Sequence, residues 1–187
     1  IDIKDEYDKI LNEFESLIRK ETPESVLEDF ITTYYHDIFG PQYDRIETQL
    51  WLKFPDLDIA DKNRRLDVLI RNSVLNDWEL FEIKRVIPLT SSYRDVPVLT
   101  KEVLYAIQQV KNYARILSQD KVKRHFAQEG ILYYEPSINL ILGNRPQIDI
   151  AQWRWLLSIN KDIKLITIDT LIEEMRLRFK DRLKAFE

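Results

Sequence analysis

Residues Leu66 to Arg85 read LDVLIRNSVLNDWELFEIKR, two runs rich in β-branched and aromatic residues around a polar turn. Asn72-Ser73 and Asn76-Asp77 are typical turn residues, because their short polar side chains hydrogen-bond to the local backbone. The pattern predicts a β-hairpin. Side chains alternate between the two faces of a strand, so Glu82 and Lys84 are expected to share one face.

The hairpin is expected to bring a second acidic residue to that face. If the chain turns midway between Val74 and Leu75, Asp67 stands directly opposite Glu82. Directly opposed residues of an antiparallel pair point to the same side, with Cβ atoms about 4.5–5.5 Å apart. Two carboxylates at this distance are unfavourable without a compensating positive charge. Lys84 supplies one such charge, and a divalent cation would supply another.

This arrangement suits metal-assisted hydrolysis of a phosphodiester. Mg²⁺ prefers a few carboxylate oxygens together with water and phosphate oxygens. Such an ion lowers the pKa of a bound water and neutralises charge during in-line attack. Lys84 would orient or deprotonate the water, or stabilise the pentavalent phosphate. By itself, however, the pattern of Asp67, Glu82 and Lys84 is weak and is more often a structural ion-pair cluster at the end of a sheet.

The flanking sequence predicts an α/β protein. Hydrophobic periodicity indicates helices over residues 5–20, 23–39, 100–117, 151–157 and 170–186. Alternating and β-branched runs indicate further strands over residues 45–54, 137–144 and 162–169. Thr22 and Thr100 are the expected N-caps, and Gly40-Pro41 should end the second helix. Helices between strands favour a mixed central sheet flanked by helices.

The domain organisation expected from this pattern is simple. Residues 1–22 form an N-terminal helical extension, and residues 23–187 form one domain that includes the C-terminal amphipathic helix. One side of that last helix is apolar, which suits packing or self-association. The chain starts without Met, which leaves room for an upstream region such as a sensor domain.

Composition excludes several classes of protein. An aromatic content of 11% argues against intrinsic disorder, and the absence of Cys excludes disulfides and thiolate zinc sites. No apolar run is long enough for a membrane span, so we expect no membrane partner and a cytoplasmic location. The net charge of −4 means that contact with nucleic acid would depend on local patches among the 28 Lys and Arg residues.

Four segments resemble the nuclease domain of the Shedu family of bacterial anti-phage defence proteins: RRLDVLI, WELFEIKR, AIQQVKNY and INLILGNR. The resemblance covers roughly Pro23 to Glu173. It implies the PD-(D/E)xK restriction-endonuclease-like fold. The chain departs from the motif that names this superfamily at Leu66, which stands where the name has Pro, a position that varies.

The resemblance also implies roles for individual residues. It makes Asp67, Glu82, Lys84 and Gln109 catalytic, and it makes Asp67, Glu82 and the carbonyl of Ile83 the metal ligands. Tyr113 and Glu24 become candidates to line the site. Without the resemblance, a surface hydrogen bond for Gln109, packing for Tyr113 and an exposed helix-start position for Glu24 explain these residues equally well or better.

The resemblance implies a Mg²⁺- or Mn²⁺-dependent DNA endonuclease in anti-phage defence, which we expect to form a homo-oligomer. The basic residues closest in sequence to the acidic pair are the candidates for contact with DNA: Lys62, Arg64, Arg65 and Arg85. Basic runs are usually solvated faces, so this role is open. Two alternatives are a catalytically inactive module of the same fold that binds nucleic acid or forms oligomers, and a regulatory protein-interaction domain built on the two terminal helices.

Overall fold

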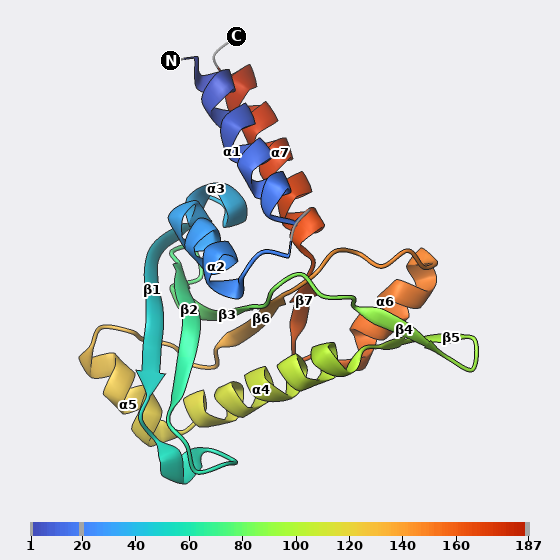
Figure 1. Cartoon of the computed structure of the whole chain (residues 1–187). Coiled ribbons are helices and arrows are strands. Elements are labelled where there is room, and N and C mark those ends of the chain that lie inside the picture. Colours follow the sequence, from blue (N-terminus) through green and yellow to red (C-terminus); the bar gives the residue numbers. More distant parts are fainter. Residues whose placement is uncertain (1, 19–20, 186–187) are drawn as a thin grey trace.

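A computed structural model describes residues 2–18 and 21–185 of the chain. Its helices are α1 (Ile3–Ile18), α2 (Glu24–Thr33), α3 (Tyr35–Phe39), the 3-10 helix η1 (Pro55–Leu57), α4 (Lys101–Leu117), α5 (Asp120–Gln128), α6 (Ile150–Ile159) and α7 (Ile168–Lys184). Its strands are β1 (Tyr43–Leu52), β2 (Arg64–Asn72), β3 (Asp77–Ile83), β4 (Thr90–Tyr93), β5 (Val96–Leu99), β6 (Ser137–Ile141) and β7 (Lys164–Ile166). The α/β class and the mixed sheet expected from the sequence are confirmed (Figure 1).

The central sheet has five strands in the order β1-β2-β3-β6-β7. Strand β2 is antiparallel to both β1 and β3, whereas β6 is parallel to β3 and β7 is parallel to β6. Parallel neighbours require crossover connections, which α4 and α5 provide before β6 and α6 provides before β7. Both parallel connections therefore pass through helices, in agreement with the helices expected between the strands.

The predicted hairpin register is also confirmed. Val68 pairs with Phe81 and Leu69 with Leu80, as a turn centred between Val74 and Leu75 requires. This register separates the two faces of the hairpin. Leu69 and Leu80 belong to the hydrophobic core beneath α4, α5 and α6. Val68 and Phe81 belong to the core beneath α1, α2, α3 and α7.

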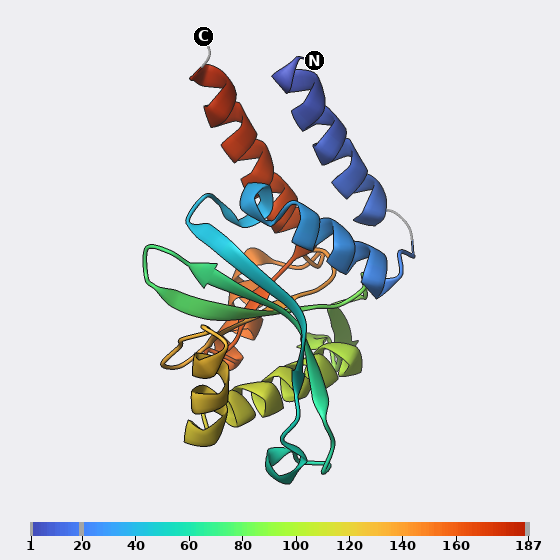
Figure 2. The same ribbon diagram turned by 90° about the vertical axis from the view of Figure 1, so that its left-hand side faces the viewer.

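The two groups of helices therefore cover opposite faces of the sheet (Figure 2). Helices α1 and α7 pack side by side and project together away from the sheet, with both chain ends at the same tip (Figure 1). The Tyr7 and Phe179 rings stack across this pair at 4.0 Å between centroids. The apolar side of the C-terminal helix is thus occupied within the chain, where Met175 and Phe179 are buried. Lys20 and Phe186, at the ends of two predicted helices, lie outside the described residues.

The predicted N-terminal boundaries need correction. The helix expected over residues 23–39 is two helices, separated at Tyr34. Thr22 does not cap it, because its hydroxyl donates to the Leu17 carbonyl at 2.5 Å. Thr100 does occupy the N-cap position of α4, but its hydroxyl donates to the Pro88 carbonyl at 2.8 Å instead of capping the helix. Gly40 ends α3 as expected.

Helix α5, the 3-10 helix η1 and the strands β4 and β5 were not predicted. Helix α5 coincides with a basic run in which only Val122 and Phe126, its two buried residues, indicate a helix. Strands β4 and β5 form a separate two-stranded hairpin with Arg94 and Asp95 at positive φ in its turn.

Within the part of the chain that the structure describes, no helix has the length and apolar character to cross a membrane.

Candidate metal and catalytic site

Asp67 and Glu82 converge at the end of the β2–β3 ladder. The last regular pair of the ladder is Val68 with Phe81. Asp67 precedes Val68 in β2 and Glu82 follows Phe81 in β3, so both acids lie just beyond that pair. The Ile83 amide donates to Asp67 Oδ2 at 2.9 Å rather than to a backbone carbonyl of β2. Asp67 is 7% exposed and Glu82 1% exposed, so both carboxyl groups lie in the protein interior. The juxtaposition predicted from the sequence is present.

Lys84 lies next to this pair. Its Nζ donates to Glu82 Oε1 at 2.7 Å and lies 3.6 Å from Glu24 Oε1 on α2. Its backbone amide extends the parallel pairing of β3 with β6, donating to the Ile141 carbonyl at 2.8 Å. The side chain is 18% exposed, so the ammonium group is largely held between carboxylates.

The acidic pair is electrostatically strained without a further cation. Burial, and then repulsion from Asp67, raise the pKa of Glu82 from 4.5 to about 8, despite the opposing effect of Lys84. Burial also raises the pKa of Asp67, although the hydrogen bond from the Ile83 amide opposes this. For Lys84, burial lowers the pKa, but Glu82, Glu24 and Asp67 together raise it above its ordinary value. The ammonium form of Lys84 is therefore favoured beside this pair.

One oxygen of the pair lacks such a donor. Glu82 Oε2 is buried and accepts no hydrogen bond from the amide, hydroxyl or ammonium donors of the described residues, although the Glu82 carboxyl group does hydrogen-bond with Asp67. A buried carboxylate oxygen without a donor costs free energy, so such atoms are rare in folded proteins and usually have a role. A cation at this oxygen would satisfy it, which is an observation in favour of metal binding.

The predicted residues of α4 face the same site. Tyr113 is 3% exposed, and burial followed by the charge of Glu82 raises its pKa. Gln109 Nε2 donates to the Tyr113 hydroxyl at 2.5 Å. Gln109 also lines a pocket of about 250 Å³ together with Lys84, Glu24 and Arg85. The helix thus closes one side of the acidic cluster and leaves an opening beside Lys84.

Helix α2 contributes an acidic residue that the sequence analysis missed. Glu28 is 7% exposed, and burial together with the charge of Asp67 raises its pKa. A hydrogen bond from Gln49 and the charge of Arg65 act in the opposite direction. Glu24, which was predicted, is 42% exposed and lies one turn earlier on the same helix. No local pattern in the sequence marks Glu28, because its burial depends on how α2 packs against the sheet.

Gln49 has an unusual backbone conformation. It lies in β1 between two regular pairs, Thr48 with Val68 and Leu50 with Leu66, which places it across from Asp67. Its φ is 54°, a left-handed conformation inside a strand. Such a conformation costs about 1–3 kcal/mol in a residue other than glycine and is concentrated at functional sites. Here it accompanies the hydrogen bond of the Gln49 side chain to Glu28.

The four basic residues proposed for DNA contact differ in their surroundings. Arg64 Nε donates to Asp58 Oδ1 at 2.7 Å, and the same carboxylate accepts from Asn112 at 2.7 Å. Because of the hydrogen bond from Arg64, the pKa of Asp58 lies far below its ordinary value. Arg64 is thus engaged in a structural ion pair. Lys62, Arg65 and Arg85 are exposed, and Arg85 lies at the pocket that contains Lys84.

The available oxygen ligands suit a hard cation that takes only a few of its ligands from the protein. Among the described residues there is no group of three or more His, Asp or Glu side chains arranged to hold a metal. A metal here would use Asp67, Glu82 and the carbonyl of Ile83, and would complete its coordination with water and phosphate oxygens. Mg²⁺ commonly binds through one or two carboxylates in this way.

A scan against protein-family models finds no match, and a search of curated proteins finds no similar sequence.

Proposed function

We propose that this chain is a metal-dependent DNA endonuclease that hydrolyses phosphodiester bonds with Asp67, Glu82 and Lys84. The observation that carries the proposal is the convergence of the two buried carboxyl groups, with no amide, hydroxyl or ammonium donor to Glu82 Oε2 among the described residues and an ammonium 2.7 Å from Glu82 Oε1. Structural ion pairs normally satisfy their buried oxygens, whereas this cluster leaves one open to a ligand.

Mg²⁺ or Mn²⁺ held by Asp67, Glu82 and the Ile83 carbonyl would supply an activated water and neutralise charge on the phosphate. The protein's own residues perform the rest. The Ile83 amide fixes the Asp67 carboxylate at 2.9 Å. Lys84 brings positive charge to the transferring phosphate and donates a hydrogen bond to it or to the attacking water. Glu28 lies close enough to Asp67 for the charge of Asp67 to raise the pKa of Glu28. Its carboxylate adds negative charge on the α2 side, which attracts the cation.

The pocket at Lys84 supports an approach for the substrate. It is bounded by the segment that follows β3, by α2 and by α4, and it includes the exposed Arg85. Arg85 is suited to contact a phosphate, because a guanidinium group binds phosphate oxygens in pairs. Lys62 and Arg65 remain candidates, whereas Arg64 already binds Asp58.

The resemblance of the sequence to Shedu nuclease domains extends the proposal. By this resemblance the proposal includes the PD-(D/E)xK superfamily and a role in cytoplasmic anti-phage defence, with DNA and further copies of the chain as partners. The mixed sheet with the acids at the end of a hairpin is compatible with that fold.

A cleavage assay tests the proposal. Purified protein is incubated with circular, linear and single-stranded DNA, with Mg²⁺, Mn²⁺ or EDTA. We expect cleavage that requires metal and disappears in Lys84→Ala, while Lys9→Ala on the exposed side of α1 retains it. Full cleavage by a folded Lys84→Ala variant would refute the assigned mechanism.

A second candidate is an inactive module that binds nucleic acid or forms oligomers. The observation in its favour is that Lys84 already neutralises Glu82 and that no third acidic ligand joins the pair in a metal-binding group of the described residues. Calorimetry with Mg²⁺ and Mn²⁺ separates the two functions. DNA binding without any metal binding would favour the inactive module.

A further inference from the structure

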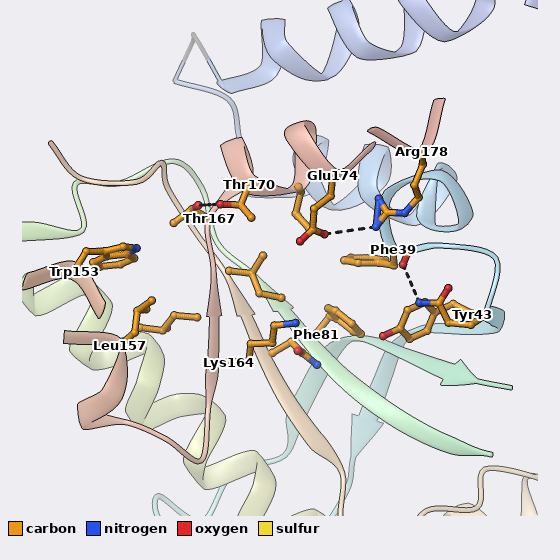
Figure 3. A pocket seen from close by; sticks show the side chains of 15 residues that line it. Phe39, Tyr43, Phe81, Trp153, Leu157, Lys164, Thr167, Thr170, Glu174 and Arg178 are labelled. Atoms are coloured by element: carbon orange, nitrogen blue, oxygen red, sulfur yellow. Dashed lines mark hydrogen bonds and ion pairs between the residues drawn. The ribbon is translucent and has the colours of Figure 1, made fainter. Parts of the chain in front are cut away.

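A second pocket lies at the β7 edge of the sheet, bounded by α3 and the first turns of α7 from one face and by α6 from the face that carries the acidic site (Figure 3). We call it the α7 pocket. Its volume is about 410 Å³, within the range of roughly 300–1,000 Å³ typical of sites for small molecules. It contains none of the residues of the acidic site, so it needs an explanation of its own.

The floor of the α7 pocket is one row of side chains across three parallel strands. Phe81 on β3 pairs with Asn139 on β6, which in turn pairs with Lys164 on β7. Paired residues of neighbouring strands project to the same face of a sheet. Because Glu82 follows Phe81, its side chain projects to the opposite face, so a single strand separates this floor from the acidic site.

Two cations face the pocket, and neither is well neutralised. Arg178 contacts Glu174 at 3.5 Å and the carbonyl of Asp37 at 3.5 Å, both long contacts (Figure 3). Burial lowers the pKa of Arg178, and the charge of Arg182 lowers it further, although Glu174 opposes the shift. Lys164 forms no ion pair or hydrogen bond within the described ranges, and its ammonium group points into the pocket.

Other basic residues of α7 are better paired. Arg182 contacts the Asp37 carboxylate at 2.5 Å, and Arg176 contacts Glu173 at 2.6 Å. Glu174, the one acid lining the α7 pocket, is 53% exposed and thus partly in solvent. The carboxylate of Glu79 also lies near the pocket, where it accepts a hydrogen bond from Tyr43. Arg178 and Lys164 therefore retain capacity for an anion that enters from solvent.

The remaining walls combine flat apolar surfaces with hydroxyl groups. Trp153, Phe39 and Phe81 contribute aromatic rings, and Figure 3 shows them around the same hollow as Lys164. Thr167 and Thr170 form a hydroxyl pair at 2.7 Å at the start of α7. Apolar walls with a few polar groups that fix orientation are the usual composition of a small-molecule site.

We propose that the α7 pocket binds a small molecule in which a flat apolar ring is joined to one anionic group, the chemistry shared by mononucleotides and aromatic carboxylic acids. The ring lies among Trp153, Phe39 and Phe81. The anionic group lies between Lys164 and Arg178. This inference does not depend on the proposed nuclease activity.

Isothermal titration calorimetry on the whole chain tests the proposal with four probes. Adenosine 5′-monophosphate and indole-3-acetate represent the two sources, and inorganic phosphate and adenosine each represent half of the ligand. We expect saturable 1:1 binding of at least one ring-bearing anion, and binding about tenfold or more weaker for phosphate and for adenosine. Which of the two anions binds more tightly identifies the source.

Variants show where the probe binds. Lys164 is exposed, so Lys164→Ala should leave the fold intact and weaken binding about tenfold. Lys180→Ala, on α7 but outside the pocket, is the matched control and should bind as the unmodified chain does. Asp67→Asn should also retain binding, which separates this site from the acidic one. No saturable binding of either anion, or unchanged binding by Lys164→Ala, would overturn the proposal.

Discussion

Asp67 Oδ2 accepts a 2.9 Å hydrogen bond from the amide of Ile83, the residue that separates Glu82 from Lys84. This one contact joins the two strands of the hairpin where their regular pairing stops. It also orients the carboxylate of β2 toward the acidic residue of β3. Structural and chemical roles of Asp67 can therefore be separated by the choice of substitution.

Asp67→Asn should abolish cleavage while preserving stability. The amide oxygen still accepts from Ile83, and loss of a charge relieves repulsion on Glu82, but a neutral side chain is a poor ligand for Mg²⁺. We expect kcat to fall by about 100-fold or more and the free energy of unfolding to stay the same or rise. Asp67→Ala, which also removes the hydrogen bond, should lower it by about 1–2 kcal/mol. Urea denaturation with a parallel cleavage assay measures both, and retained activity in Asp67→Asn would contradict a metal role.

The stability of the metal-free protein should fall as the pH rises from about 4.5 to about 8. The pKa of Glu82 is raised from 4.5 to about 8, so the folded state binds a proton that the unfolded state releases. The stabilisation that the Glu82 proton contributes is fully present below pH 4.5 and is lost as the pH rises through about 8. Between these values the free energy of unfolding falls by up to about 1.4 kcal/mol per pH unit. Denaturation in EDTA across this range measures the slope. Glu82→Gln should flatten it, and an equally steep slope in that variant would assign it to other groups.

The same shift predicts how Mg²⁺ affects stability. A cation competes with the proton for the Glu82 carboxylate, so it should stabilise the protein more at pH 8 than at pH 5. Thermal unfolding with and without Mg²⁺ at the two pH values measures the difference. A stabilisation independent of pH would place the cation elsewhere.

Glu28→Gln should reduce metal-dependent cleavage more than Glu24→Gln does. Glu28 is buried and the charge of Asp67 raises its pKa, whereas Glu24, whose charge acts on both Asp67 and Glu82, is 42% exposed to solvent that screens it. We expect a loss of about 10–100-fold for Glu28→Gln, as for residues that support metal ligands, and a smaller loss for Glu24→Gln. The ratio of kcat/KM between the two variants is the measurement. A larger loss for Glu24→Gln would show that the predicted residue, not the missed one, supports the site.

Asp58→Asn should destabilise the protein without abolishing cleavage. The Asp58 carboxylate binds Arg64 and Asn112 and accepts hydrogen bonds from the Ala60 and Lys62 amides. We expect a loss of about 2–3 kcal/mol in the free energy of unfolding. Because the pKa of Asp58 is lowered in the folded state, its stabilisation is present above 3.8 and lost as the pH falls below that value. The variant should therefore lose part of the acid sensitivity in denaturation experiments, and unchanged acid sensitivity would contradict this role.

The hairpin and its acidic pair could be predicted because strand geometry leaves few choices. Once the turn lies between Val74 and Leu75, alternation fixes which residues share a face, and apolar pairing of Leu69 with Leu80 supports the register. The predicted set Asp67, Glu82, Lys84 and the α4 residues is brought together in one region. These residues are either close together in the sequence, as in the hairpin, or regularly spaced along one helix.

The missed features depend on contacts between distant segments. Glu28 looks like an ordinary helical glutamate until α2 is packed beside β2. Arg64 looks free until Asp58, in the turn after η1, folds back onto it. Thr22 and Thr100 have side chains typical of N-caps, yet each hydroxyl finds a carbonyl elsewhere. The β4–β5 hairpin lacks the Asn-Gly or Asp-Gly pair that marks such turns, and Arg94 and Asp95 take the left-handed conformation instead.

Consecutive residues of β3 face different compartments: Phe81 lines the α7 pocket, and Glu82 belongs to the acidic site. Deleting or inserting one residue within β3 would therefore exchange them, sending a carboxylate among aromatic rings and a phenyl ring among carboxylates. The same change in the exposed turn at Val74 and Leu75 could be absorbed without touching either compartment. Length variation among natural variants of this chain should accordingly be confined to that turn and be absent from β3.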